Sequence, residues 1–100
     1  MIKVILTKKD DNVNKVIING HAGYDDFGKD IVCSAASSIV TTTINGILSF
    51  DKEGLSYEVS KDGLVIKNIK TDNITQTLLN NMISLWKELE KHYTTNVEVK

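Results

Sequence analysis

One histidine and the only cysteine of this 100-residue chain, His21 and Cys33, have eleven residues between them. A thiolate is a strong nucleophile, and an imidazole can take the thiol proton and later return it to a leaving amine. The sequence predicts a strand that ends before His21 and a helix that begins before Cys33. A helix start favours the thiolate form of a cysteine and offers unpaired backbone N–H groups to an oxyanion. These features predict a small intracellular cysteine peptidase in which His21 activates the Cys33 thiol.

Two further side chains lie close to this pair in the sequence. Asp30 has two candidate roles, because its carboxylate can cap the expected helix or orient the His21 imidazole. The capping role is favoured, since Asp is among the preferred N-cap residues. Ser37 lies one helical turn beyond Cys33, where its hydroxyl can bind the imidazole or the substrate backbone. We expect both residues to support the dyad.

The residues between His21 and Cys33 have the composition of a lid that closes over an extended peptide. Two glycines offer hinges, and two aromatic residues offer apolar contacts. The expected substrate loop comprises Gly20, Ala22, Gly23, Tyr24, Phe27 and Gly28. Asp25 and Asp26 are expected at a solvated loop tip, although an acidic tip can also attract a basic peptide.

Each candidate also has a structural interpretation that the residues alone do not exclude. A lone cysteine at the start of an amphipathic helix is more often a small buried residue than a nucleophile. A lone histidine at a strand end is usually a surface or hydrogen-bonded structural residue. Only the pairing of the two supports catalysis, and a redox sensor that uses Cys33 alone is a further alternative. His92 has no such partner, and we expect it to complement the dipole at the end of a helix.

The elements that position this pair follow from the spacing of the apolar residues. Residues 2–6 and 15–19 predict two strands of a hairpin whose turn lies at residues 10–12. From Asp30 the apolar period changes to three and four residues, which predicts a helix. Its expected buried face comprises Val32, Ala36, Ile39, Val40, Thr43 and Ile47.

A second hairpin and a second helix are predicted for the rest of the chain. Residues 55–60 and 64–69 predict strands joined at Asp62-Gly63, a pair that tolerates positive φ angles. A helix is expected from about residue 72 to 91, and residues 94–99 predict an edge strand. The expected apolar stripe of this helix is Ile74, Leu78, Met82, Leu85 and Leu89, flanked by Leu79 and Trp86. We therefore expect a single α+β domain over residues 1–100, of order ββαββαβ, with two helices packed on one face of a mainly antiparallel sheet.

Composition and charge exclude several other classes of protein. Apolar residues make up 41% and charged residues 25%, as in ordinary globular domains, and a net charge of −1 offers no general attraction for nucleic acid or membranes. One cysteine and two distant histidines form no zinc motif, so no metal or other cofactor is expected. We find no signal peptide and no run of about 20 apolar residues, and a lone cysteine suits a reducing compartment. A cytoplasmic location is therefore expected.

A longer motif surrounds the pair. Gly20-His21-Ala22, then Gly28, then Asp30-Ile31-Val32-Cys33-Ser34-Ala35 and Ser37 resemble the ribosomal-processing cysteine protease family, as do chain length and element order. The resemblance implies a bacterial endopeptidase that removes the N-terminal extension of a large-subunit ribosomal protein, cuts after a hydrophobic segment and works as a homodimer. It also implies that His21 is the base and Cys33 the nucleophile, with Asp30 and Ser37 supporting them. Residues 24–27 receive no role from it.

The alternative function is a catalytically silent adaptor. Such a protein would bind a ribosomal protein or a ribosome-assembly factor through the second helix and an open sheet edge. An adaptor predicts ordinary alkylation of Cys33, whereas a peptidase predicts fast, pH-dependent alkylation that slows when His21 is removed.

Overall fold

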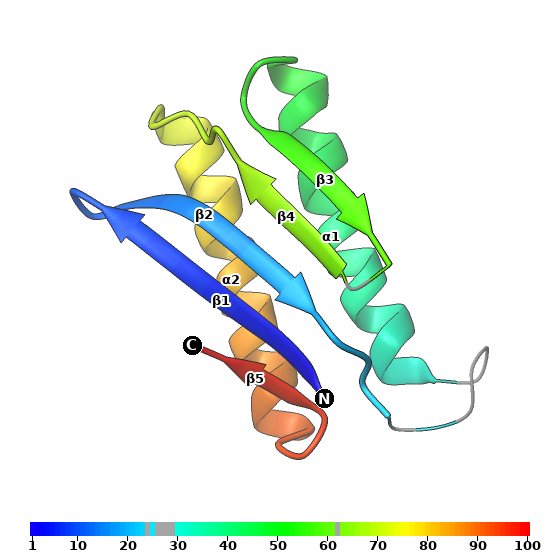
Figure 1. The fold of residues 1–100 in the computed structure, drawn as a ribbon. Helices are drawn as coiled ribbons and strands as arrows, with labels where there is room; N and C mark the ends of the chain where they lie inside the picture. The colour runs from blue at the N-terminus through cyan, green and yellow to red at the C-terminus, as the bar shows by residue number, and fades with distance from the viewer. Residues whose placement is uncertain (24, 26–29, 62) are drawn as a thin grey trace.

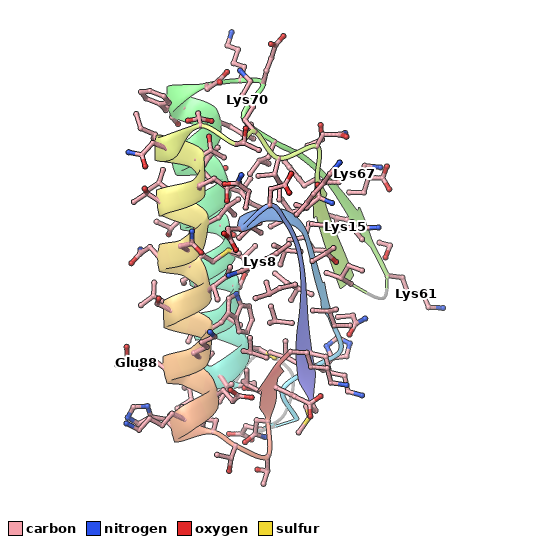
Figure 2. All side chains as sticks on the ribbon, turned by 90° about the vertical axis from the view of Figure 1, so that its left-hand side faces the viewer. Lys8, Lys15, Lys61, Lys67, Lys70 and Glu88 are labelled. Carbon is pink, nitrogen blue, oxygen red and sulfur yellow. The ribbon has the colours of Figure 1, made fainter. Side chains whose placement is uncertain are left out.

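The chain forms a five-stranded sheet with two helices on one of its faces (Figures 1 and 2). This computed structural model describes residues 1–23, 25, 30–61 and 63–100. The strands lie in the order β3-β4-β2-β1-β5, and all neighbours are antiparallel except β1 and β5. The elements are β1 (Ile2–Lys9), β2 (Asn12–Asn19), α1 (Ile31–Phe50), β3 (Ser56–Ser60), β4 (Gly63–Lys67), α2 (Asn73–His92) and β5 (Val97–Val99). The predicted α+β class and the order ββαββαβ are confirmed.

The hairpin of β1 and β2 is longer than predicted and ends in a tight two-residue turn. Asp10 and Asp11 have φ angles of 52° and 66°, the positive values that the central residues of a type I′ turn require. Asp tolerates this conformation better than most residues, so the acidic pair lets the strands continue up to the turn.

The hydrophobic core lies between the sheet and the helices. Val4, Val16 and Ile66 contribute from β1, β2 and β4, and Leu79 and Trp86 contribute from α2, all with 0% exposure. The strand residues face the helices because side chains alternate along a strand and only one sheet face is covered.

The predicted buried face of α2 is partly wrong. Met82 is buried as expected, but Ile74 and Leu85 are 42% and 39% exposed, and Ile83 and Trp86 lie in the core instead. The apolar residues of α2 cover more than one face, so their period alone does not choose which face meets the sheet.

A buried side chain helps to decide the rotation of α2. The Gln76 side-chain oxygen accepts a hydrogen bond from the Val13 N–H (2.8 Å), and its amide donates to the carbonyl oxygens of Val13 (3.1 Å) and Lys70 (2.9 Å). These bonds hold the Gln76 face of α2 against β2, which turns Ile74 and Leu85 outward.

Asp30 and Asp51 cap the two ends of α1, and four of its residues are buried: Val32, Ala36, Ile44 and Ile47. Its length and composition are also those of a helix able to cross a membrane, so the expectation that no segment approaches a membrane span was too broad. Core helices of globular proteins meet the same test, and here α1 lies on the same face of the sheet as α2.

An ion pair joins the end of α1 to the segment that follows β4. The Lys70 ammonium donates to the Asp51 carboxylate at 2.6 Å. This hydrogen bond, together with one from the Glu53 backbone N–H, holds the pKa of Asp51 below its ordinary value of 3.8. Lys70 lies at the end of the molecule opposite the start of α1 (Figure 2).

Candidate active site

His21 follows β2 by way of a backbone turn that only glycine accommodates. Gly20 has a φ of +88°, and a Cβ there would lie 2.2 Å from the Met1 carbonyl oxygen. The chain therefore leaves the sheet at Gly20, and His21 is exposed at the end of β2.

The segment after His21 is fastened to the C-terminal part of the chain. The Asn96 side-chain amide donates to the Ala22 carbonyl oxygen at 2.8 Å, and the Asn96 carbonyl accepts from the Ile2 N–H at 2.8 Å. Ala22 is only 2% exposed. Asn96 thus joins β1, β5 and the residue next to His21, a role that no local sequence signal indicates because Asn96 and Ala22 are 74 positions apart.

Asp30 caps α1 as predicted. One of its carboxylate oxygens, Oδ1, accepts hydrogen bonds from the backbone N–H groups of Val32 and Cys33, both at 2.9 Å. The other oxygen accepts a hydrogen bond from the Asp25 N–H at 3.3 Å, and Asp30 is only 7% exposed. The carboxylate therefore organises both the first turn of the helix and the chain that leads into it.

This cap changes one expectation about the chemistry of the first turn. The N–H groups of Val32 and Cys33 bind the Asp30 carboxylate, and the Ser34 N–H donates to the Asp30 carbonyl at 3.1 Å. These three donors are already paired, so the prediction that unpaired N–H groups around Cys33 receive an oxyanion is wrong for them.

His21, Cys33 and Ser37 line the same opening in the surface. All three border a cleft of about 390 Å³ between α1, the end of β2 and the β3–β4 hairpin. All three also border a second hollow of about 770 Å³, which extends over Asp30 and Ser38. Cys33 is half-buried and His21 is exposed, so a ligand in either space can reach both side chains.

Part of the predicted substrate loop lies outside the described residues, namely Tyr24, Phe27 and Gly28. Among the described members, Gly23 has a φ of +66° and borders the second hollow, and Gly20 borders the cleft. Whether this loop acts as a lid stays a prediction.

His92 lies apart from this opening. It is in the last turn of α2, where its Nδ1 atom is 2.9 Å from the Glu88 carbonyl oxygen, and it borders neither of the two spaces. Among the described residues, no three His, Cys, Asp or Glu side chains gather as a metal site would require.

Comparison with known proteins identifies the family. The family model described as cysteine protease Prp matches residues 1–98. The chain belongs to this cysteine protease family. Two curated relatives, both named ribosomal processing cysteine protease Prp and both from Staphylococcus aureus strains, are 30% identical over 103 aligned residues, covering 99% of this chain and 97% of the relative.

Solved structures agree with membership of the Prp family. The S. aureus ribosomal processing protease Prp in complex with a covalently linked product peptide superposes with a TM-score of 0.93 and 29% identity, over 100% of this chain and 98% of the other. The same S. aureus protease in complex with a substrate peptide gives a TM-score of 0.85 with the same identity and coverage. A Streptococcus mutans protein, 22% identical, shares the fold with a TM-score of 0.86 over 100% of this chain and 92% of its own.

Proposed function

We propose that this chain is an endopeptidase that removes the N-terminal extension of a bacterial large-subunit ribosomal protein, with His21 and Cys33 as its catalytic dyad. The observation that carries the proposal is the shared opening lined by His21, Cys33 and Ser37 in a chain of the cysteine protease Prp family. A cleft of about 390 Å³ is within the usual range for sites that enclose side chains of a ligand. The S. aureus relatives are ribosomal processing cysteine proteases, which supports a ribosomal substrate for this chain.

The reaction has two steps. The His21 imidazole accepts the Cys33 thiol proton, the Sγ atom bonds to the scissile carbonyl carbon, and the C–N bond breaks as the imidazolium returns the proton to the leaving amine. Water then attacks the thioester while His21 accepts its proton, which releases the carboxylate product and restores the thiol.

Two neighbouring residues hold this arrangement in place. Asp30 holds the first turn of α1 in place beside Cys33, because its carboxylate accepts hydrogen bonds from the Val32 and Cys33 N–H groups. Ser37 borders the same opening one turn later, where its hydroxyl can donate to a substrate carbonyl.

The enzyme is proposed to act in the cytoplasm as a homodimer. Three apolar side chains of the helices are exposed in a single copy, namely Ile31 (56%) and Phe50 (62%) at the two ends of α1 and Ile74 (42%) on α2, and a second copy that packs against the helices would cover them. Sedimentation of the purified chain at several concentrations tests this part of the proposal.

Mass spectrometry of a peptide that carries the ribosomal protein's N-terminal extension tests the reaction. We expect one cut by the native chain, no cut by Cys33→Ala, and a rate about 10²–10⁴ times lower for His21→Ala, because general-base assistance contributes that much. His92→Ala is the matched control, since it removes the other histidine, which lies outside the cleft.

Alkylation of Cys33 separates the peptidase from the adaptor. A peptidase requires faster alkylation in the native chain and in His92→Ala than in His21→Ala. Normal cleavage by Cys33→Ala would refute the mechanism. An alkylation rate of Cys33 that is the same in the native chain and in His21→Ala would favour a catalytically silent adaptor.

A further inference from the structure

The second hollow beside Cys33 has polar walls. It has a volume of about 770 Å³ and extends from the proposed dyad over the first two turns of α1, where Ser34 and Ser38 border it. The described residues that border it include two aspartates and three serines but no Lys, no Arg and no aliphatic residue. These walls therefore offer hydrogen-bond acceptors and negative charge, and little apolar surface.

The dyad lies where this hollow meets the cleft of about 390 Å³. Of the described residues, only His21, Cys33 and Ser37 border both spaces. A peptide whose scissile carbonyl carbon lies at the Cys33 Sγ atom has one segment on each side of the scissile bond. In an extended peptide the two segments lead away from Cys33 in opposite directions, so only one of them can follow the cleft and the other is left to the hollow.

The hollow has the length that such a segment requires. Three extended residues span about 10 Å, at about 3.3–3.6 Å per residue. Ser38 follows Cys33 by five helical residues, which is about 7.5 Å along the axis of α1 at 1.5 Å per residue. The second or third residue from the cut is therefore level with Ser38, which is exposed and borders the hollow but not the cleft.

We propose that the substrate segment on one side of the scissile bond binds in this hollow along the first two turns of α1, and that Ser38 contacts its second or third side chain. A side chain that donates hydrogen bonds, such as Lys, fits these walls. A Glu side chain there would instead face the carboxylates of Asp25 and Asp30. The inference rests on the proposed function, because the occupant is the peptide that Cys33 cleaves.

A charge placed at residue 38 tests the path of the peptide. Starting from the sequence that the native chain cuts, each of the three residues on either side of the cut is replaced in turn by Lys or by Glu. The anisotropy of a fluorescent label on the peptide then gives the affinity of the inactive Cys33→Ala protein, so that binding is measured without cleavage. The same peptides are measured with Ser38→Lys and with Ser38→Glu, each combined with Cys33→Ala.

The matched control is Thr42→Lys, again combined with Cys33→Ala. Thr42 is exposed one turn beyond Ser38 on α1 and borders neither space, and it lies about 13.5 Å along the helix from Cys33, beyond the reach of three residues. Urea unfolding of each variant shows that the added charge leaves the fold intact.

We expect the protein with native Ser38 to bind the Lys peptide more tightly than the Glu peptide at the second or third position on one side of the cut. Ser38→Lys should lower this preference about fivefold and Ser38→Glu should raise it by a similar factor, because each charge acts on both peptides in opposite directions. Both effects should shrink in 0.5 M salt, and Thr42→Lys should change the preference by less than about twofold.

Four results would overturn the inference. They are a preference that neither Ser38 variant changes, equal effects of Ser38→Lys and Thr42→Lys, equal effects on both sides of the cut, and tighter binding of the Glu peptide by the protein with native Ser38. Any of these results with peptides that the native chain still cuts would leave the proposed function intact. Conversely, peptides that depend on Ser38 as expected but are never cut by the native chain would refute the proposed function and leave this binding site in place.

Discussion

Replacing Asp30 with alanine removes the acceptor of two hydrogen bonds in the first turn of α1. The Val32 and Cys33 N–H groups then lose their 2.9 Å partner, and the side chain that held them is almost completely buried. Loss of an N-cap costs about 0.5–2 kcal/mol, and two donors on one carboxylate place Asp30→Ala in the upper part of that range, at about 1.5–2 kcal/mol. For a domain of this size the melting temperature should fall by roughly 6–16 °C, at about 4–8 °C per kcal/mol.

The same substitution should affect the reactivity of Cys33. The turn that carries Cys33 loses its cap, so Asp30→Ala should slow both alkylation of Cys33 and peptide cleavage. Asp30→Asn keeps an oxygen acceptor and should retain most of the stability, with a loss of about 0.3–1 kcal/mol from the missing charge at the helix start. Urea unfolding followed by Trp86 fluorescence gives the stability, and iodoacetamide kinetics give the reactivity.

A matched control uses the other helix. Asp72 caps α2 through the Thr75 N–H, at 3.1 Å, so Asp72→Ala should lower stability without changing the alkylation rate of Cys33. An unchanged melting temperature in Asp30→Ala would refute the capping argument. Native stability combined with lost cleavage in Asp30→Asn would instead show that the reaction needs the Asp30 charge, as expected if Asp30 orients His21.

Three further outcomes are expected. Gly20→Ala should unfold at clearly lower urea concentration, because the added Cβ would lie 2.2 Å from the Met1 carbonyl oxygen. Gly46→Ala, at a helix position with open space around it, is the control and should raise the unfolding free energy by about 0.5–1 kcal/mol. Equal changes in stability for the two variants would contradict the close approach at Gly20. Asn96→Asp keeps the size of the side chain but removes the amide donor to the Ala22 carbonyl oxygen, so we expect a lower kcat with little change in KM. A native kcat would count against a role of the Asn96–Ala22 hydrogen bond in positioning His21. The pKa of Asp51 is lower in the folded chain than its ordinary value of 3.8, so the ion pair with Lys70 stabilises the fold at pH values above 3.8, and this contribution is lost as the pH falls through the folded pKa. The difference in unfolding free energy between the native chain and Lys70→Met should therefore shrink from pH 7 to about pH 2. A difference that stays constant over this range would refute a stabilising role of the ion pair.

Short-range patterns were enough to predict most elements of this fold. Alternation along β1 and β2, the acidic turn at Asp10 and Asp11, and the capping residue at Asp30 act within a few residues, so their physical effects are readable from the chain. The motif around His21 and Cys33 likewise led to the correct family, because it is contiguous in the sequence.

Contacts between distant segments decided the rest. The apolar residues of α2 allow several rotations, and hydrogen bonds of Gln76 to Val13, 63 positions away, place Trp86 and not Leu85 in the core. The anchor from Asn96 to Ala22 depends on β5 pairing beside β1, which no local pattern specifies.

The elements, the candidate side chains and the cap that starts α1 could be predicted from local sequence, because these features depend on neighbours along the chain. Three features could not be predicted in this way: His21 and Cys33 border one opening, the Val32 and Cys33 N–H groups already bind Asp30, and the cleft extends to Val59. These features arise where α1, β2 and the β3–β4 hairpin meet, and that meeting depends on how the helices pack on the sheet, which the spacing of residues within each element does not specify.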